Sequence, residues 1–148
     1  MRFRRLNSEE LETLEQEFIE FLAVSGIEAH DWENFKTTNP DFCEEKICEF
    51  SDVVIGTILS QADYAEHRSK NNWILFKFNK DDISAIIIHS DQLDLTENTL
   101  NEANLEAVSI SKTSKPYSPN KEDELFKMMQ QGCVITDGRI FDSIDQIR

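Results

Sequence analysis

Apolar residues recur at helical spacing near the start of the chain, a pattern that predicts an amphipathic helix. Its apolar positions are Leu11, Leu14, Phe18, Phe21 and Leu22. Asn7 is a suitable N-cap residue, and Glu10, three residues later, can complete a capping box with it. Gly26 follows the last apolar position, so we expect the helix to end there.

A long helix is predicted to begin at Asn39-Pro40, as N-cap and first helical position, and to run to about Ala65. Its main apolar stripe consists of Cys43, Ile47, Phe50, Val54 and Ile58. A short helical turn at 31–35 precedes it. Gly56 costs about 1 kcal/mol relative to alanine in a helix interior, so we expect another backbone to pack closely against it.

The hydrophobic period changes from that of a helix to that of a strand at about residue 72. Trp73–Phe78 and Ile83–His89 flank a four-residue loop, a pattern typical of a β-hairpin. Pairing Phe78 with Ile83 makes both faces of this hairpin apolar, so the sheet is either covered on both sides or offers one side to a partner. We expect no residue before Asn72 to join the sheet.

A second hairpin is predicted near the end of the chain. Cys133–Thr136 and Arg139–Phe141 flank Asp137-Gly138, a strong signal for a type I′ turn with two positive φ angles. The other expected elements are a loop over 90–104, a strand at 108–110, an exposed connection over 112–120, a helix from 118 to 131 and a helical turn at 143–147.

Together these elements predict an α+β fold, in which acidic N-terminal helices pack on a small, mostly antiparallel sheet built from two β-hairpins. We expect a single domain over 1–148, with a helical layer at about 6–68 and a sheet-containing part at about 72–148. The longest uninterrupted apolar runs have four residues, whereas a transmembrane helix needs about 20. Acidic residues follow the basic start, where a signal peptide would be apolar. We therefore expect a cytoplasmic protein without membrane contact.

The net charge of the 148-residue chain is −14, and it is unevenly distributed. Residues 9–66 hold sixteen acidic and only two basic side chains, while the remainder is balanced. A net charge of magnitude about 2–8 suffices for the solubility of a small domain. We therefore expect an acidic helical surface that contacts a basic protein. Its predicted residues, chosen because they lie opposite the apolar stripes, are Glu9, Glu12, Glu20, Glu45, Glu49 and Asp52.

Three other interpretations of the sequence remain open. The acidic surface can be a solvated face kept for solubility. It can instead mimic the phosphates of a nucleic acid, which requires carboxylates spaced along a surface. The third alternative is a small hydrolase or transferase with a site near Tyr64–Arg68, where polar residues of several kinds are densest. A closed pocket holding His67 with a carboxylate in hydrogen-bond reach would favour that enzyme.

The sequence contains no motif for metal, cofactor or nucleophilic chemistry. Its three histidines and three cysteines lack the spacings of a shared metal ion, and an odd number of cysteines does not indicate a disulfide framework. Four glycines form no phosphate-binding loop. We therefore expect no catalytic residue, no cofactor and no metal. Direct binding of nucleic acid is not expected either, because the acidic field opposes phosphate.

The two ends of the chain resemble a known family. The start is Arg2-Phe3-Arg4-Arg5-Leu6, followed by Glu9-Glu10-Leu11, Leu14, Glu17-Phe18 and Phe21-Leu22. The end is Gln131-Gly132-Cys133-Val134-Ile135-Thr136-Asp137-Gly138-Arg139-Ile140-Phe141. Both are similar to a family of short uncharacterised bacterial proteins, a domain of unknown function. The resemblance implies a stand-alone cytoplasmic domain, and it assigns no catalytic or binding residue.

Overall fold

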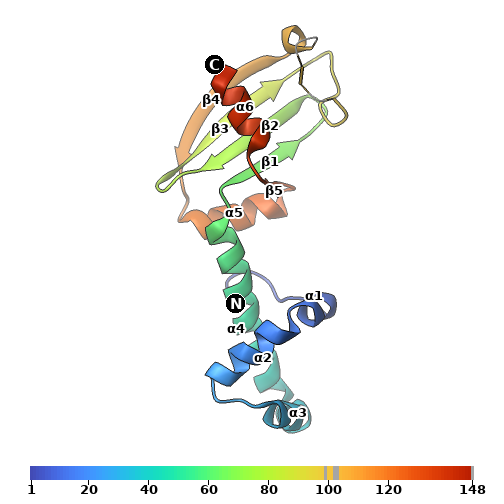
Figure 1. Ribbon diagram of the computed structural model, residues 1–148, viewed down its shortest axis with the longest axis vertical. Coiled ribbons are helices and arrows are strands. Elements are labelled where there is room, and N and C mark those ends of the chain that lie inside the picture. Colours follow the sequence, from blue (N-terminus) through green and yellow to red (C-terminus); the bar gives the residue numbers. More distant parts are fainter. Residues whose placement is uncertain (99, 102–103, 148) are drawn as a thin grey trace. The chain divides into compact units, whose positions relative to one another are not determined.

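The computed structural model describes residues 1–98, 100–101 and 104–147 (Figure 1). The chain divides into two compact units, Met1–Ile58 and Leu59–Arg148, which are described in turn. The single domain over 1–148 stays a prediction. The helices and strands give the α+β class that the sequence predicts.

The first unit is helical. Its helices are α1 (Ser8–Thr13), α2 (Glu15–Val24), α3 (Ala29–Thr38) and most of α4 (Pro40–Gln61), which continues into the second unit. The single first helix of the sequence prediction is wrong, because Leu14 lies between α1 and α2 with φ −104° and ψ 22°. Leucine favours helices, so the sequence pattern gives no sign of this break.

The helix boundaries agree with the capping signals. The Asn7 side chain accepts from the Glu10 backbone and the Glu10 side chain accepts from the Asn7 backbone, each at 2.9 Å, which confirms the capping box. Gly26 has φ +82° just after α2 and confirms the predicted end. The predicted turn at 31–35 is the longer helix α3. The long helix ends at Gln61, not near Ala65 as predicted.

Aromatic side chains join the helices of the first unit. The rings of Phe18 and Phe21 in α2 lie 5.0 and 5.4 Å from Phe50 in α4, measured between centroids. Phe18 also meets Trp32 of α3 edge-on at 5.2 Å. The close approach expected at Gly56 comes from a side chain, not from a backbone, because the Phe3 ring lies 3.4 Å from the position of an added Cβ.

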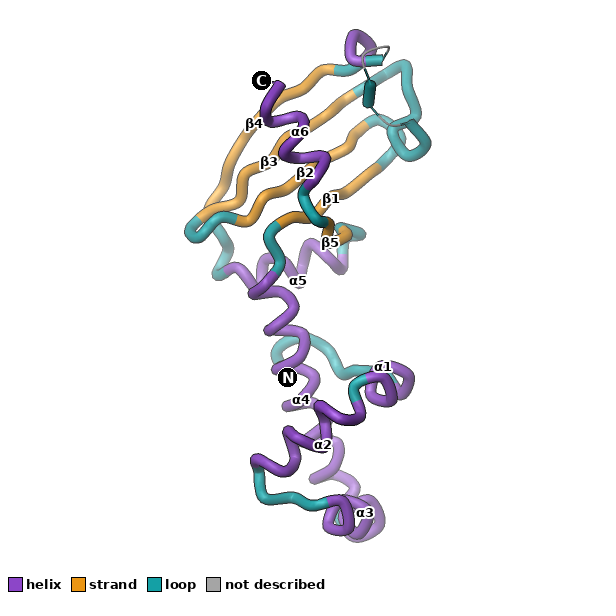
Figure 2. The backbone as a smooth tube through the Cα atoms, in the orientation of Figure 1, coloured by secondary structure: helices purple, strands orange, loops and turns teal. Residues whose placement is uncertain are grey.

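The second unit contains a five-stranded sheet in which all neighbouring strands are antiparallel (Figure 2). Its strands are β1 (Tyr64–Arg68), β2 (Asn72–Phe78), β3 (Asp82–His89), β4 (Ser109–Pro116) and β5 (Val134–Thr136). Their order in the sheet is β4-β3-β2-β1-β5. Besides the end of α4, the helical elements among the described residues of this unit are η1 (Leu105–Ala107), α5 (Lys121–Gln130) and α6 (Arg139–Ile147).

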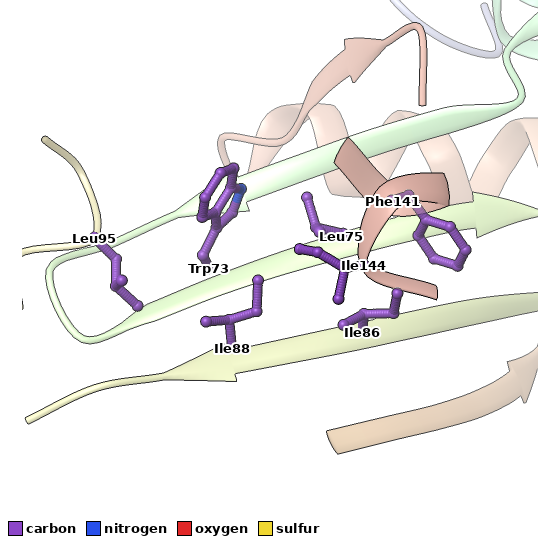
Figure 3. Close-up of a cluster of buried hydrophobic side chains, with 7 residues drawn as sticks. All are labelled: Trp73, Leu75, Ile86, Ile88, Leu95, Phe141 and Ile144. Atoms are coloured by element: carbon purple, nitrogen blue, oxygen red, sulfur yellow. The ribbon is translucent and has the colours of Figure 1, made fainter. Parts of the chain in front are cut away.

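The predicted central hairpin is confirmed, including its register, since Phe78 lies opposite Ile83. Helix α6 lies across one face of the sheet, here called the α6 face (Figure 1). The buried cluster on this face is shown in Figure 3 and consists of Trp73, Leu75, Ile86, Ile88, Leu95, Phe141 and Ile144. The opposite face remains partly open, because Ile74, Phe76 and Ile87 are only half-buried around a groove of about 230 Å³.

The expectation that no residue before Asn72 joins the sheet is wrong. Strand β1 pairs with β2 along its whole length, from Tyr64 opposite Lys77 to Arg68 opposite Trp73. Only Ala65 is buried in β1, and polar side chains lie on both of its faces. A strand of this composition shows no apolar alternation, so its sequence does not distinguish it from a helix end.

The predicted second hairpin is also wrong. Strand β5 pairs with β1 instead, and Arg139–Phe141 belongs to α6. Asp137 has no positive φ, so the type I′ turn does not form. Phe141 and Ile144, three residues apart on α6, are both buried against the sheet, and this tertiary burial outweighs the local turn signal.

The segments between the two predicted hairpins differ in detail from the prediction. Strand β4 has eight residues and includes part of the connection predicted over 112–120. The predicted helix from 118 to 131 is confirmed in type but is shorter, as α5. Within the loop predicted over 90–104, residues 99 and 102–103 lie outside the described residues, and a 3-10 turn follows the loop as η1.

Candidate protein-binding surface

Five of the six predicted interface residues are exposed in the first unit. Glu9 and Glu12 lie on α1 and Glu20 on α2, whereas Glu45 and Glu49 lie on α4. Most of these carboxylates have few internal partners. Among the described residues, the side chains of Glu9, Glu12 and Glu45 have no hydrogen bond or ion pair. Glu49 pairs with Lys46 at 3.1 Å.

The predicted residues do not form one continuous patch. Phe18 and Phe21 face Phe50, so α2 and α4 turn their apolar sides toward each other. On α2, Glu20 lies on the side of the helix away from Phe18 and Phe21, and on α4, Glu45 lies on the side away from Phe50. The carboxylates therefore lie on two sides of the α2–α4 pair, a division that each helix pattern alone does not reveal.

Asp52, the sixth predicted residue, is half-buried and accepts hydrogen bonds from the start of the chain. The backbone N–H groups of Arg2 and Phe3 donate to its two carboxylate oxygens at 2.7 and 2.8 Å. The Leu6 N–H donates to the Ser51 hydroxyl at 2.9 Å. These bonds hold the segment Arg2–Leu6, here called the basic arm, against α4.

Two arginines of the basic arm pair with glutamates that the sequence prediction did not include. Arg4 donates two hydrogen bonds to the Glu10 carboxylate, each of 2.9 Å. Arg5 forms an ion pair with Glu44. The one sequence signal for such pairs is that three arginines directly precede an acidic helical segment. This signal does not identify Glu44 as the partner of Arg5, because the two residues lie 39 positions apart in the chain.

The Arg4–Glu10 pair predicts a pH dependence of stability. Hydrogen bonds from the Arg4 side chain and then from the Asn7 backbone lower the pKa of Glu10 from 4.5 to about 2. A lowered folded-state pKa stabilises the fold above the unfolded value, and this contribution is lost as the pH falls from 4.5 to about 2. Because both side chains are partly exposed, we expect less than about 1 kcal/mol.

The measurement compares the protein with and without Glu10→Gln by urea unfolding, followed by Trp32 fluorescence in a Trp73→Phe background, across this pH range. The protein that retains Glu10 should be more stable at neutral pH, and the difference should shrink as Glu10 becomes protonated. A difference that stays constant down to pH about 2 would show that the Glu10 carboxylate does not stabilise the fold in this way.

The polar cluster near Tyr64–Arg68 is divided between the two faces of the sheet. Tyr64, Glu66 and Arg68 alternate with His67 along β1, so His67 points to the opposite side. Among the described residues, no carboxylate forms a hydrogen bond or an ion pair with His67. The structure therefore does not bring together the arrangement that would favour an enzyme at this cluster.

The other side chains of this cluster are engaged within the second unit. The Tyr64 hydroxyl donates to Asp142 of α6 at 3.1 Å, and burial together with this carboxylate raises the pKa of Tyr64. The indole N–H of Trp73 donates to Glu66 at 3.0 Å. Arg68 lies 4.0 Å from the Trp73 ring centre and donates to two backbone carbonyls of the loop after β3, those of Leu95 and Asn98, each at 2.8 Å. These contacts stabilise the α6 face.

Other candidate groups offer little chemistry. Burial raises the thiol pKa of Cys43 and of Cys133, which disfavours the nucleophilic thiolate. Glu28, His30 and Asp31 have ligand atoms within 4.8 Å of one another at the start of α3. The carboxylates of Glu28 and Asp31 already form the capping box of α3.

In the described part of the chain, no helix is long and apolar enough to cross a membrane.

Comparisons with known proteins identify a family but no function. A family model described as "Family of unknown function (DUF6495)" matches residues 1–148. No curated protein and no solved structure matches the chain. The resemblance inferred from the two ends of the sequence is confirmed as far as a family of unknown function. The shared motifs and the bacterial origin stay predictions.

Proposed function

We propose that this chain, which belongs to the family of unknown function DUF6495 along its whole length, is a protein-binding module. Its acidic helical surface contacts a basic protein, and the module works in the cytoplasm as an adaptor without chemistry of its own. The observation that carries the proposal is the concentration of the net charge of −14 in residues 9–66. Such a field attracts and orients a basic partner.

The exposed carboxylates support this proposal. Glu12 and Glu20 on α1 and α2, and Glu45 and Glu49 on α4, all face solvent. Excess charge of one sign destabilises a compact unit by self-repulsion. Among the described residues, the side chains of Glu12 and Glu45 have no hydrogen bond or ion pair that offsets this cost, whereas Glu49 pairs with Lys46. Binding of a basic partner would offset the self-repulsion. Since the carboxylates lie on two sides of the α2–α4 pair, the partner contacts one side or extends around both.

A charge-matched pair of variants tests the proposal. In the first variant, Glu12, Glu20, Glu45 and Glu49 are replaced by Gln, which changes the net charge from −14 to −10. In the second, four exposed residues of the second unit give the same net charge. These control substitutions, all after residue 66, are Asp81→Asn, Asp91→Asn, Glu97→Gln and Glu106→Gln.

Each protein is used as bait in extracts of its native cell at low and high salt. Basic proteins should be retained by the wild type and the control variant at low salt, and lost from the first variant. If the first variant retains the same proteins in the same yield while folded, the acidic surface only keeps the protein in solution. Double variants of Glu12 and Glu20, or of Glu45 and Glu49, show which side the partner contacts. Nucleic-acid-binding proteins among those retained would favour the phosphate mimic.

A further inference from the structure

The basic arm lies on the face of α4 that carries part of the predicted interface. The residues of this face, at intervals of four, three and four, are Glu45, Glu49, Asp52 and Gly56. Asp52 accepts from the arm's backbone at Arg2 and Phe3. The Phe3 ring covers Gly56, lying 3.4 Å from the position of an added Cβ. The arm therefore already occupies one end of this face.

The contacts of the arm are those that an extended basic peptide would make with an acidic helical surface. Arg4 and Arg5 each meet a carboxylate with two hydrogen bonds, the geometry in which guanidinium binds carboxylate most specifically. Backbone N–H groups bind a third carboxylate, Asp52. The arm thus shows which chemistry this surface recognises.

We propose that the basic arm is an internal occupant of this α4 face, and that an extended, arginine-bearing segment of the basic partner displaces it. This inference rests on the proposed function and names both the partner segment and the regulation of the surface. Leu6 is only 2% exposed and donates to Ser51, so it stays in place while Arg2–Arg5 is displaced. The exposed ion pairs of Arg4 and Arg5 each contribute little to stability, so a partner segment with more contacts can replace this part of the arm. While the arm is bound, the apparent affinity for the partner falls in proportion to the fraction of open protein.

Two variants of the full chain loosen the arm and are tested with a hexa-arginine peptide as the probe. Phe3→Ala removes the contact with Gly56 without changing the charge. Arg5→Gln removes the ion pair with Glu44. Its matched control is Lys36→Gln, which removes the exposed ion pair with Glu33 in the same unit but leaves the arm unchanged. We expect Phe3→Ala and Arg5→Gln to bind the peptide about two- to fivefold more tightly than the wild type, because each removes one weak interaction that holds the arm. Lys36→Gln should bind less tightly than Arg5→Gln.

The backbone amide signals of Arg2 and Phe3 report displacement directly. In the free protein both N–H groups donate to Asp52. Saturating peptide should move both amide proton shifts toward the values of unbonded amides, whereas the amide of Leu11, inside α1, should stay in place.

The outcomes separate this inference from the proposed function. Tighter binding by both arm variants together with movement of the two amide signals supports displacement. If the wild type binds the peptide but the amide signals stay in place and Arg5→Gln equals Lys36→Gln, the arm is a fixed part of the fold. The inference is then wrong, while the proposed function stands. If no protein binds the peptide, including the two arm variants, both proposals are wrong.

Discussion

Gly138→Ala is expected to destabilise the second unit by about 2–5 kcal/mol. Gly138 has φ +79°, a conformation that costs an L-residue about 1–2 kcal/mol. An added Cβ would also lie 2.3 Å from Cδ2 of the Tyr64 ring, and overpacking of this kind costs about 1–3 kcal/mol. The ring cannot easily move away, because its hydroxyl donates to Asp142 in the first turn of α6.

The control for this prediction is Gly132→Ala in the same unit. Gly132 also has a positive φ, +102°, but an added Cβ there would approach His67 no closer than 3.4 Å. Its cost should be about 1–2 kcal/mol, from the backbone alone. Urea unfolding followed by Trp73 fluorescence, in a Trp32→Phe background, measures both changes. Equal losses for the two variants would show that the contact between Gly138 and the Tyr64 ring is not tight.

Ile88→Ala is expected to cost about 2–5 kcal/mol of the free energy of unfolding of the second unit. Ile88 is 0% exposed in the buried cluster of the α6 face, next to Trp73 (Figure 3). Truncation leaves a cavity that α6 and the strands can close only in part.

A matched truncation in the same unit is Ile140→Ala. Ile140 is the second residue of α6 and is 40% exposed, so its truncation should change the stability by no more than about 0.5 kcal/mol. The same unfolding measurement serves for both variants. If Ile88→Ala costs as little as Ile140→Ala, the cluster under α6 is not the core of the second unit.

Some local signals in the sequence predicted their elements correctly, although the turn signal at Asp137-Gly138 did not. The capping box at Asn7 and Glu10 depends only on residues three apart, and the structure contains it. The register of the hairpin follows from a short loop and from two alternating segments, and Phe78 pairs with Ile83 as predicted. Such features could be found because the interacting residues are neighbours in the chain.

The elements that sequence reasoning missed depend on distant residues. Strand β1 has few apolar residues and is defined by its pairing with β2 and β5. Helix α6 replaces a predicted hairpin strand because Phe141 is buried against strands more than fifty residues earlier in the chain. The contacts of the basic arm with Asp52 span about fifty residues. No periodicity within a short window contains this information.

The candidate surface also combines features that the local sequence predicts with features that depend on distant residues. Exposure of Glu9, Glu12 and Glu20 follows from the helical pattern, because each lies opposite an apolar stripe. The engagement of Asp52 by the arm, and the placement of carboxylates on both sides of the α2–α4 pair, follow only from the tertiary packing.

The association rate with a retained basic protein, measured by stopped-flow mixing over a range of salt concentrations, tests the acidic surface most directly. For the wild type and for the charge-matched control in the second unit, the rate should be high at low salt and fall steeply as salt is added. The variant with Gln at positions 12, 20, 45 and 49 should associate more slowly, with a weaker dependence on salt. Equal rates and equal salt dependence for all three proteins would contradict the account.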